Sequence, residues 1–144
     1  MTAQFLLDTM VLSELVRREP HPRVRAWAEA QHEDTLHCSV LTLGEIAHGI
    51  ARLDESPRKE ALRWWVLHDL PRRFGDRLLD VDPAVALIWG QLQGEANRSG
   101  LTLPALDSLL AATARVHQLT VVTRNVRDLE RCGVPILNPW EDQS

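Results

Sequence analysis

Short apolar runs alternate with longer segments of helical periodicity, and this alternation limits the fold more than any other feature of the sequence. The first run, residues 5–7, is continuously apolar, as a strand of a parallel sheet covered on both faces requires. Similar runs at about 35–40, 78–81, 120–123 and 135–137 predict four further strands. We therefore expect an α/β fold, a three-layer α/β/α sandwich around a mostly parallel sheet of about five strands.

The intervening segments carry apolar residues at helical spacing. Helices are predicted at about 11–18, 23–31, 43–53, 56–70, 82–100 and 105–117. Ser56-Pro57 and Asp82-Pro83 combine a capping side chain with a proline in the first turn, which is typical of helix starts. Pro71 is expected to end the fourth helix at Leu70. Because Trp64 and Trp65 are adjacent, we expect one to face the core and the other a neighbouring helix or a partner chain.

The bulk properties describe an ordinary globular chain. With 144 residues and 44% hydrophobic residues, we expect one domain covering residues 1–144. The formal net charge of −4 means that nucleic acid would bind only through a local basic patch, a bound cation or a basic partner. Cys38 and Cys132 lack metal-site spacing and are expected to be free thiols. No signal-peptide pattern or membrane-length apolar run occurs, so we expect a soluble, cytoplasmic protein with no membrane contact.

Four acidic residues occupy related positions in this predicted fold. Asp8 directly follows the first strand, and Asp128 follows the strand at 120–123. Glu45 comes early in the helix after the second strand, and Asp107 lies in the first turn of the helix that follows Pro104. In a parallel sheet, the carboxyl ends of strands and the starts of the following helices share one edge. The four carboxylates are therefore expected to converge, although they are far apart in sequence.

Each of these acids also has a simpler interpretation. Asp8 is suited to cap the helix that follows it. A helical wheel places Glu45 opposite the apolar face, which is typical of a solvated surface acid. Asp107 either complements the helix dipole or, beside so many leucines and alanines, needs a partner for a partly buried charge. The residues alone leave these alternatives open.

Converging carboxylates repel one another and raise each other's pKa unless a cation neutralises them. Oxygen ligands without cysteine or histidine favour Mg²⁺ or Mn²⁺ over zinc. Such a site can activate water and stabilise the charge of a transferring phosphoryl group, which is the chemistry of phosphodiester hydrolysis. A bound cation would also let this acidic chain accept a phosphate.

Several segments resemble one protein family. They are Leu6-Leu7-Asp8-Thr9, residues 39–46, residues 104–114, residues 122–129 and the closing Asn138-Pro139-Trp140. Together these segments resemble the PIN-domain nucleases, in particular the VapC-type toxins of bacterial toxin–antitoxin pairs, and the terminal Asn-Pro-Trp resembles the FitB-like branch. The resemblance covers nearly the whole chain in the right order and spacing.

The resemblance implies a metal-dependent endoribonuclease that acts as a growth-inhibiting toxin, using Mg²⁺ or Mn²⁺. By position, Asp8, Glu45 and Asp107 would be the metal ligands, with either Asp128 or Asn125 in the fourth position. Thr9 and Thr123 would support the site through their hydroxyls. Arg124 would contact phosphate or form an ordinary surface salt bridge. Met10 departs from the family, in which asparagine is common after Asp-Thr.

The resemblance also implies partners. A homodimer or higher oligomer is expected, together with a cognate antitoxin that covers the acidic groove. The antitoxin would carry the DNA-binding domain, so operator DNA would be contacted only through it. The sequence does not identify the RNA that would be cut.

Two other interpretations differ in class. A haloacid-dehalogenase-like phosphatase would use a strand-end aspartate as a covalent nucleophile, but it requires a second acid two residues later, where this chain has Met10. A non-catalytic binding module would use the acids only as helix caps. Stabilisation by Mn²⁺ would separate that module from a nuclease.

Overall fold

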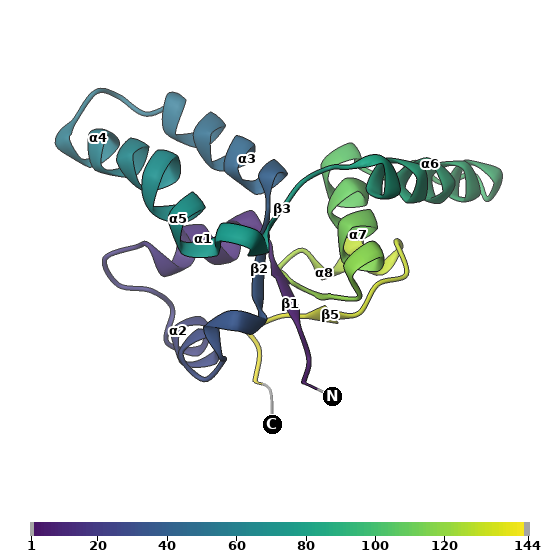
Figure 1. The fold of residues 1–144 in the computed structure, drawn as a ribbon, viewed down its shortest axis with the longest axis horizontal. Helices are drawn as coiled ribbons and strands as arrows, with labels where there is room; N and C mark the ends of the chain where they lie inside the picture. Colours follow the sequence, from purple (N-terminus) through teal and green to yellow (C-terminus); the bar gives the residue numbers. More distant parts are fainter. Residues whose placement is uncertain (1, 143–144) are drawn as a thin grey trace.

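A computed structural model describes residues 2–142. Its strands are β1 (Phe5–Leu7), β2 (Leu36–Ser39), β3 (Leu78–Leu79), β4 (Thr120–Val122) and β5 (Ile136–Leu137). They form a 5-stranded sheet in the order β3-β2-β1-β4-β5, and every neighbouring pair is parallel. The predicted parallel sheet is confirmed, with β1 at its centre (Figure 1).

Helices cover both faces of this sheet. They are α1 (Thr9–Leu15), α2 (Pro22–Glu29), α3 (Val40–Ala51), α4 (Pro57–Trp64), α5 (Leu70–Phe74), α6 (Pro83–Arg98), α7 (Ala105–His117) and α8 (Val126–Glu130). The first five lie on one side of the sheet in Figure 1, and α6, α7 and α8 lie on the other. The arrangement confirms the expected three layers.

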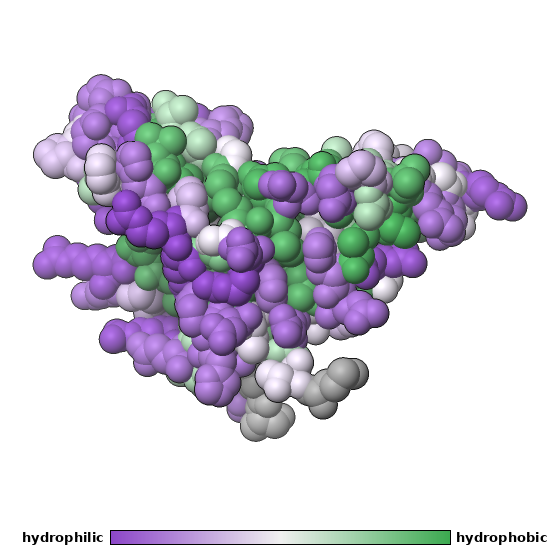
Figure 2. All heavy atoms as spheres, viewed as in Figure 1, coloured by the Kyte–Doolittle hydropathy of each residue, from purple (hydrophilic) through white to green (hydrophobic). Residues whose placement is uncertain are grey.

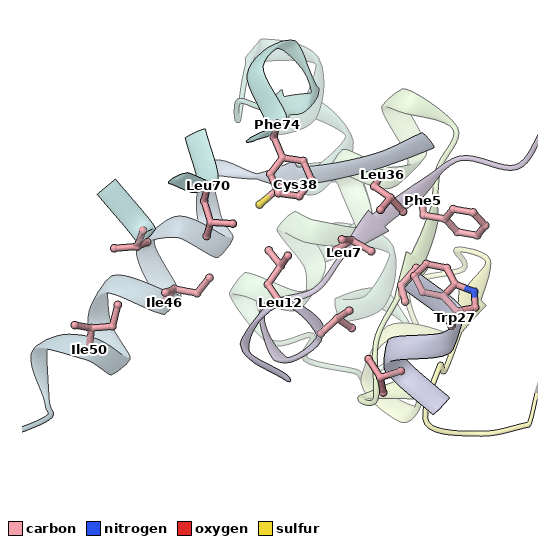
Figure 3. Close-up of a cluster of buried hydrophobic side chains, with 14 residues drawn as sticks. Phe5, Leu7, Leu12, Trp27, Leu36, Cys38, Ile46, Ile50, Leu70 and Phe74 are labelled. Atoms are coloured by element: carbon pink, nitrogen blue, oxygen red, sulfur yellow. The ribbon is translucent and has the colours of Figure 1, made fainter. Parts of the chain in front are cut away.

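Two separate apolar cores fill the spaces between the layers. Phe5 and Leu7 belong to the core beneath the first five helices, whereas Leu6 belongs to the core beneath α6 and α7. This alternation follows from the twofold side-chain period of a strand. In the first core, shown in Figure 3, the ring of Phe5 meets Trp27 edge to face, with centroids 5.1 Å apart. Burial on both faces explains why β1 is continuously apolar.

One predicted helix end is wrong. The helix expected to stop at Leu70 continues from α4 through a π-helical turn, Trp65–Asp69, into α5, which ends at Phe74. The N–H of Leu70 donates to the carbonyl of Trp65 in this wide turn. Pro71 then occupies a first-turn position of α5, where its missing N–H and fixed φ are tolerated. The π-helical turn therefore accommodates the proline that was expected to break the helix.

Other boundaries differ by a few residues. α1 begins at Thr9 rather than at residue 11, and α3 begins at Val40 rather than at residue 43, because Asp8 and Ser39 cap these helices directly after their strands. The short helix α8 was not predicted, because its polar sequence has little helical periodicity. Trp65 packs against the first core, as expected for one member of the tryptophan pair. Trp64 is exposed, and its ring lies tilted against that of His68, one turn further along the same helix, with ring centroids 3.9 Å apart. A contact of Trp64 with a partner chain stays a prediction.

Both cysteines are buried free thiols, as expected. Burial raises the pKa of the Cys38 thiol to about 12, so it stays protonated and unreactive near neutral pH. Across residues 2–142, none of the helices has the length and apolar character needed to cross a bilayer.

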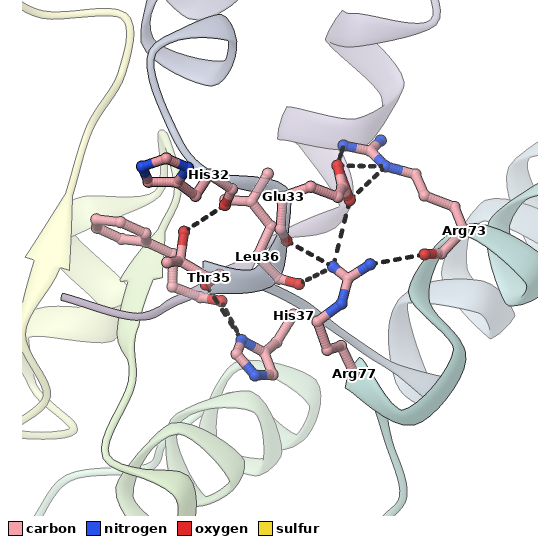
Figure 4. Close-up of polar contacts among 8 residues, drawn as sticks. His32, Glu33, Thr35, Leu36, His37, Arg73 and Arg77 are labelled. Carbon is pink, nitrogen blue, oxygen red and sulfur yellow. Dashed lines mark hydrogen bonds and ion pairs between the residues drawn. The ribbon is translucent and has the colours of Figure 1, made fainter. Parts of the chain in front are cut away.

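A polar cluster at the start of β2 joins this strand to α5 (Figure 4). Nη2 of Arg73 lies 2.9 Å from Oε1 of Glu33, and Nη1 of Arg77 lies 3.3 Å from Oε2. Arg77 also donates to the backbone carbonyl of Glu33 at 2.8 Å and to that of Arg73 at 2.7 Å. Two guanidinium groups thus hold one carboxylate and the adjoining backbone.

This cluster predicts a pH-dependent contribution to stability. Burial raises the pKa of Glu33, but the hydrogen bonds and charges of Arg73 and Arg77 outweigh it and hold the pKa below its ordinary 4.5. A carboxyl with a lowered folded pKa contributes stability that is present above 4.5 and lost as the pH falls through the folded value. Because Glu33 is partly exposed, we expect Glu33→Gln to cost only about 0.5–1 kcal/mol at pH 7.

Urea unfolding of Glu33→Gln and the wild type at several pH values between 3 and 7 measures this contribution. The difference should shrink as the pH falls below about 4.5, the ordinary value of a glutamate. Glu29→Gln is the matched control, since Glu29 pairs with Arg25 on one exposed helix face. Equal, pH-independent losses for both variants would contradict the role assigned to Arg73 and Arg77.

Candidate active site

Asp8 is the helix cap that one interpretation of the sequence predicted. It is the N-cap residue of α1, and its Oδ1 accepts the backbone N–H of Thr9 at 2.7 Å. Its Oδ2 accepts the hydroxyl of Thr123, the residue directly after β4, at 2.7 Å. The side chain is only 6% exposed. Asp8 is therefore a helix cap whose carboxylate is also fixed from the neighbouring strand.

Glu45 lies on α3 and contacts α1. Its Oε1 accepts the hydroxyl of Thr9 at 2.8 Å, and the residue is partly buried. The helical wheel, which indicated a solvated surface acid, was wrong on this point. A wheel considers one helix alone, whereas here α1 packs beside α3 and brings a hydroxyl donor to the polar side.

Asp107 lies in the first turn of α7, as expected. Its Oδ2 accepts the side-chain amide of Asn125 at 3.2 Å. The backbone N–H of Asn125 in turn donates to the Thr123 hydroxyl oxygen at 2.9 Å. One continuous path of hydrogen bonds therefore runs from Glu45 through Thr9, Asp8, Thr123 and Asn125 to Asp107.

The negative charge of Asp128 acts on Asp107. Burial raises the pKa of Asp107, and the charges of Asp8, Asp128 and Glu45 raise it further, against the lowering effect of the Asn125 hydrogen bond. The pKa of Asp8 is also raised, chiefly by burial, although its bonds to Thr123 and Thr9 oppose this. The four predicted acids thus form one electrostatic cluster at the carboxyl edge of the sheet.

The chemistry of this cluster fits a hard divalent cation. Carboxylate oxygens are the donors such ions prefer, and a cation would offset the repulsion that raises the pKa of Asp107. Within residues 2–142, however, no three acidic, histidine or cysteine side chains are already arranged as a metal-binding group. Hydrogen bonds from Thr9, Thr123 and Asn125 instead hold three of the acids. Each carboxylate oxygen retains a second lone pair for a cation.

Arg124 and Met10, the other residues singled out, are both exposed. The guanidinium carbon of Arg124 lies 5.2 Å from the ring centroid of Trp140. This is a cation–π contact, whereas the sequence suggested a phosphate contact or a surface salt bridge. Met10 lies in the first turn of α1. Trp140 belongs to the Asn138-Pro139-Trp140 segment directly after β5, and its contact with Arg124 is not visible in the sequence pattern.

Comparisons with known proteins agree with this geometry. Residues 5–134 match the PIN domain family. The chain is 35% identical to toxin FitB of Neisseria gonorrhoeae over 137 residues, covering 95% of this chain and 99% of the relative. It is 33% identical to the VapC ribonuclease Y4jK of Sinorhizobium fredii over 136 residues, covering 94% and 97%.

A solved structure of FitAB bound to the IR36 DNA fragment superposes with a TM-score of 0.89 at 33% identity, covering 98% of this chain and 99% of that one. The fold of this solved structure and the two sequence relatives match nearly the full length of the chain, in agreement with the family match. The four-acid edge thus lies in a chain that belongs to the PIN domain family.

Proposed function

We propose that this chain is a metal-dependent endoribonuclease that acts as the toxin of a toxin–antitoxin pair. The hydrogen-bonded path joining Glu45, Asp8 and Asp107 carries the proposal, because it gathers acids from three distant segments at the ligand-binding edge of a parallel sheet. Membership of the PIN domain family and relatives named as a VapC ribonuclease and as toxin FitB support it.

In this proposal Asp8, Glu45 and Asp107 hold Mg²⁺ or Mn²⁺. When bound, such a cation supplies a more acidic water and offsets negative charge on a phosphate. The chain orients its own ligands: Thr9 contacts both Asp8 and Glu45, and Thr123 fixes the second oxygen of Asp8. Holding the carboxylates in place before substrate arrives reduces the reorganisation that the reaction requires.

Asn125 and Asp128 have different roles in this proposal. Asn125 is a positioning residue, because its amide donates to Asp107. Asp128 adds negative charge beside Asp107 and is the fourth acid of the cluster. A carboxylate farther from the cation contributes through its charge and through intervening water.

Replacing Asn125 tests this division of roles. Asn125→Ala frees one oxygen of Asp107 and should lower the RNA cleavage rate by about 10–100-fold, the usual effect of removing a group that orients a metal ligand. Glu130→Gln, an exposed change on α8, the short helix that begins directly after Asn125, is the matched control and should be neutral. Wild-type kinetics and metal affinity for Asn125→Ala would contradict the positioning role.

The alternative, a non-catalytic binding module, differs in its response to metal. The pKa values of Asp8 and Asp107 are raised above their ordinary 3.8. Without metal, the folded state therefore binds more protons than the unfolded state, and its stability falls as the pH rises from 3.8 through the raised pKa values. Added Mn²⁺ competes with these protons, so its stabilising effect should grow with pH. At 100 times Kd we expect about 2.7 kcal/mol of stabilisation. Thermal melts with Mn²⁺ and EDTA measure it, and unchanged melts would favour the binding module.

We also propose a cognate antitoxin and a homodimer as partners. The solved FitAB complex supports the first. Exposed apolar surface supports both: Figure 2 shows a band of hydrophobic side chains across the middle of this face. A pocket of about 310 Å³ is lined by Val40, Leu41, Gly44, Glu45, His48 and Leu106. Apolar surface of this kind is typical of a covered interface, and Glu45 connects it with the acidic cluster.

Induced expression in a bacterial host tests the function as a whole. Growth should stop, and sequencing of RNA ends should reveal new cleavage sites. Co-expression of the product of a small neighbouring reading frame should restore growth. Asp107→Asn provides the inactive control. Growth arrest by Asp107→Asn with the same RNA ends as the wild type would contradict the proposal.

A further inference from the structure

The register of the sheet brings two loops together beside the acidic cluster. Val122 of β4 pairs with Leu137 of β5, and the N–H of Thr123 donates to the carbonyl of Leu137 at 3.0 Å. The chain after each strand therefore leaves the sheet at the same edge. Arg124 begins one loop, and Asn138-Pro139-Trp140 begins the other.

The second loop fixes the Trp140 ring. The side-chain oxygen of Asn138 accepts the backbone N–H of Trp140 at 3.0 Å, and Pro139 is buried. Arg23 of α2 donates to the carbonyl of Trp140 at 3.4 Å. The ring packs against the first core. Trp140 is thus a fixed aromatic surface, and Arg124 lies over it with 5.2 Å between its guanidinium carbon and the ring centroid.

Arg124 stands between the two residues that hold the acids. Thr123 before it donates to Asp8, and Asn125 after it donates to Asp107. Arg124 is exposed, and none of the ion pairs found within residues 2–142 joins it to Asp8, Glu45, Asp107 or Asp128. The backbone of Arg124 therefore lies between the two residues that hold the acids, while its guanidinium is placed over the Trp140 ring and is not neutralised by these acids.

A guanidinium in this position suits a phosphate group. Its planar array of N–H donors matches phosphate oxygens, and stacking on an aromatic ring limits the side-chain freedom that binding would otherwise remove. A chain with a net charge of −4 gains most from a fixed cation where a nucleic acid backbone must approach.

We propose that Arg124 binds a backbone phosphate of the RNA next to the one that is cut, and that Trp140 is a positioning residue that holds Arg124 for this contact. The inference rests on the proposed ribonuclease function and identifies part of its substrate-binding surface. It assigns the closing Asn-Pro-Trp segment a role in substrate binding.

Two measurements on the full chain test it. Fluorescence anisotropy with a labelled single-stranded RNA in Ca²⁺ gives Kd over a range of salt concentrations, and cleavage in Mn²⁺ gives kcat and KM. Arg124→Ala should raise Kd about tenfold, reduce the slope of log Kd against log salt by about 0.7, and raise KM with little change in kcat. Arg124→Lys should recover most of the salt slope but only part of the affinity.

Trp140→Leu should weaken binding less than Arg124→Ala does, and Trp140→Phe should restore it. Combining Trp140→Leu with Arg124→Ala should add little, because both changes remove the same contact. Arg115→Ala is the matched control, since Arg115 is exposed in the last turn of α7, the opposite end from Asp107. It should leave Kd and the salt slope unchanged.

An unchanged Kd and salt slope in Arg124→Ala would overturn the inference, and so would a loss of thermal stability and kcat at constant Kd, which would indicate a purely structural clamp. If the wild type binds RNA through Arg124 but does not cut it, the phosphate contact stands and the proposed cleavage falls. If the wild type binds no RNA in Ca²⁺ or Mn²⁺, both fall.

Discussion

Asp8→Asn is expected to abolish RNA cleavage while the protein remains folded. The change removes one negative charge from the proposed metal-binding group, so several kcal/mol of transition-state stabilisation disappear and the rate falls by at least about 1,000-fold. Folding should survive, because asparagine is as good a helix cap as aspartate. Without metal, stability should stay close to that of the wild type, because asparagine relieves the buried charge of Asp8 but loses one acceptor, the oxygen that binds the Thr123 hydroxyl.

Asp82→Asn distinguishes a metal ligand from a helix cap. Asp82 caps α6 by accepting the N–H of Val85 at 3.0 Å. Asp82→Asn is therefore the same substitution at the same kind of helix cap as Asp8→Asn. Cleavage rates from gel assays and melting curves should be near wild type for Asp82→Asn. If Asp8→Asn cuts RNA at the rate of Asp82→Asn, Asp8 is only a cap.

Among the variants proposed for stability measurements, Phe74→Ala is expected to lose the most free energy of unfolding. Phe74 ends α5, is 1% exposed and belongs to the first core (Figure 3). The guanidinium carbons of Arg73 and Arg77 lie 5.0 Å and 5.3 Å from its ring centroid, so the ring also supports the cluster around Glu33. Removing a buried phenyl ring costs about 3–5 kcal/mol, a large part of the total stability of a small domain.

Urea unfolding followed by circular dichroism measures this loss. Phe74→Leu refills part of the space and should cost less than half as much. Leu87→Ala is the matched surface control, because Leu87 is 75% exposed on α6, and its effect should stay within about 0.5 kcal/mol. A loss below 1 kcal/mol for Phe74→Ala would show that α5 is not part of the cooperative core.

Parts of the site were predictable because they follow from strand ends. Asp8 comes directly after an apolar strand, and Asp107 follows a proline at a helix start, so a shared sheet edge brings them together without any knowledge of contacts. The parallel sheet was predictable for the same reason, since its strands are continuously apolar. These signals are local in the sequence.

The missed features depend on contacts between distant segments. Glu45 appeared solvated until α1 brought the Thr9 hydroxyl to it. Pro71 appeared to stop a helix, but a π-helical turn absorbs it. The stacking of Arg124 on Trp140 requires the register between β4 and β5, which no periodicity reveals. Helical wheels and proline rules describe one segment at a time and cannot include such neighbours.

Cleavage of single-stranded RNA by the purified protein, with Mn²⁺ and then with excess EDTA, tests the central claim most directly. The account predicts internal cuts in Mn²⁺, none in EDTA, recovery when Mn²⁺ is restored, and none by Asp8→Asn under any of these conditions. Cutting that persists in EDTA, or that Asp8→Asn retains, would contradict a metal-dependent site built on the four acids.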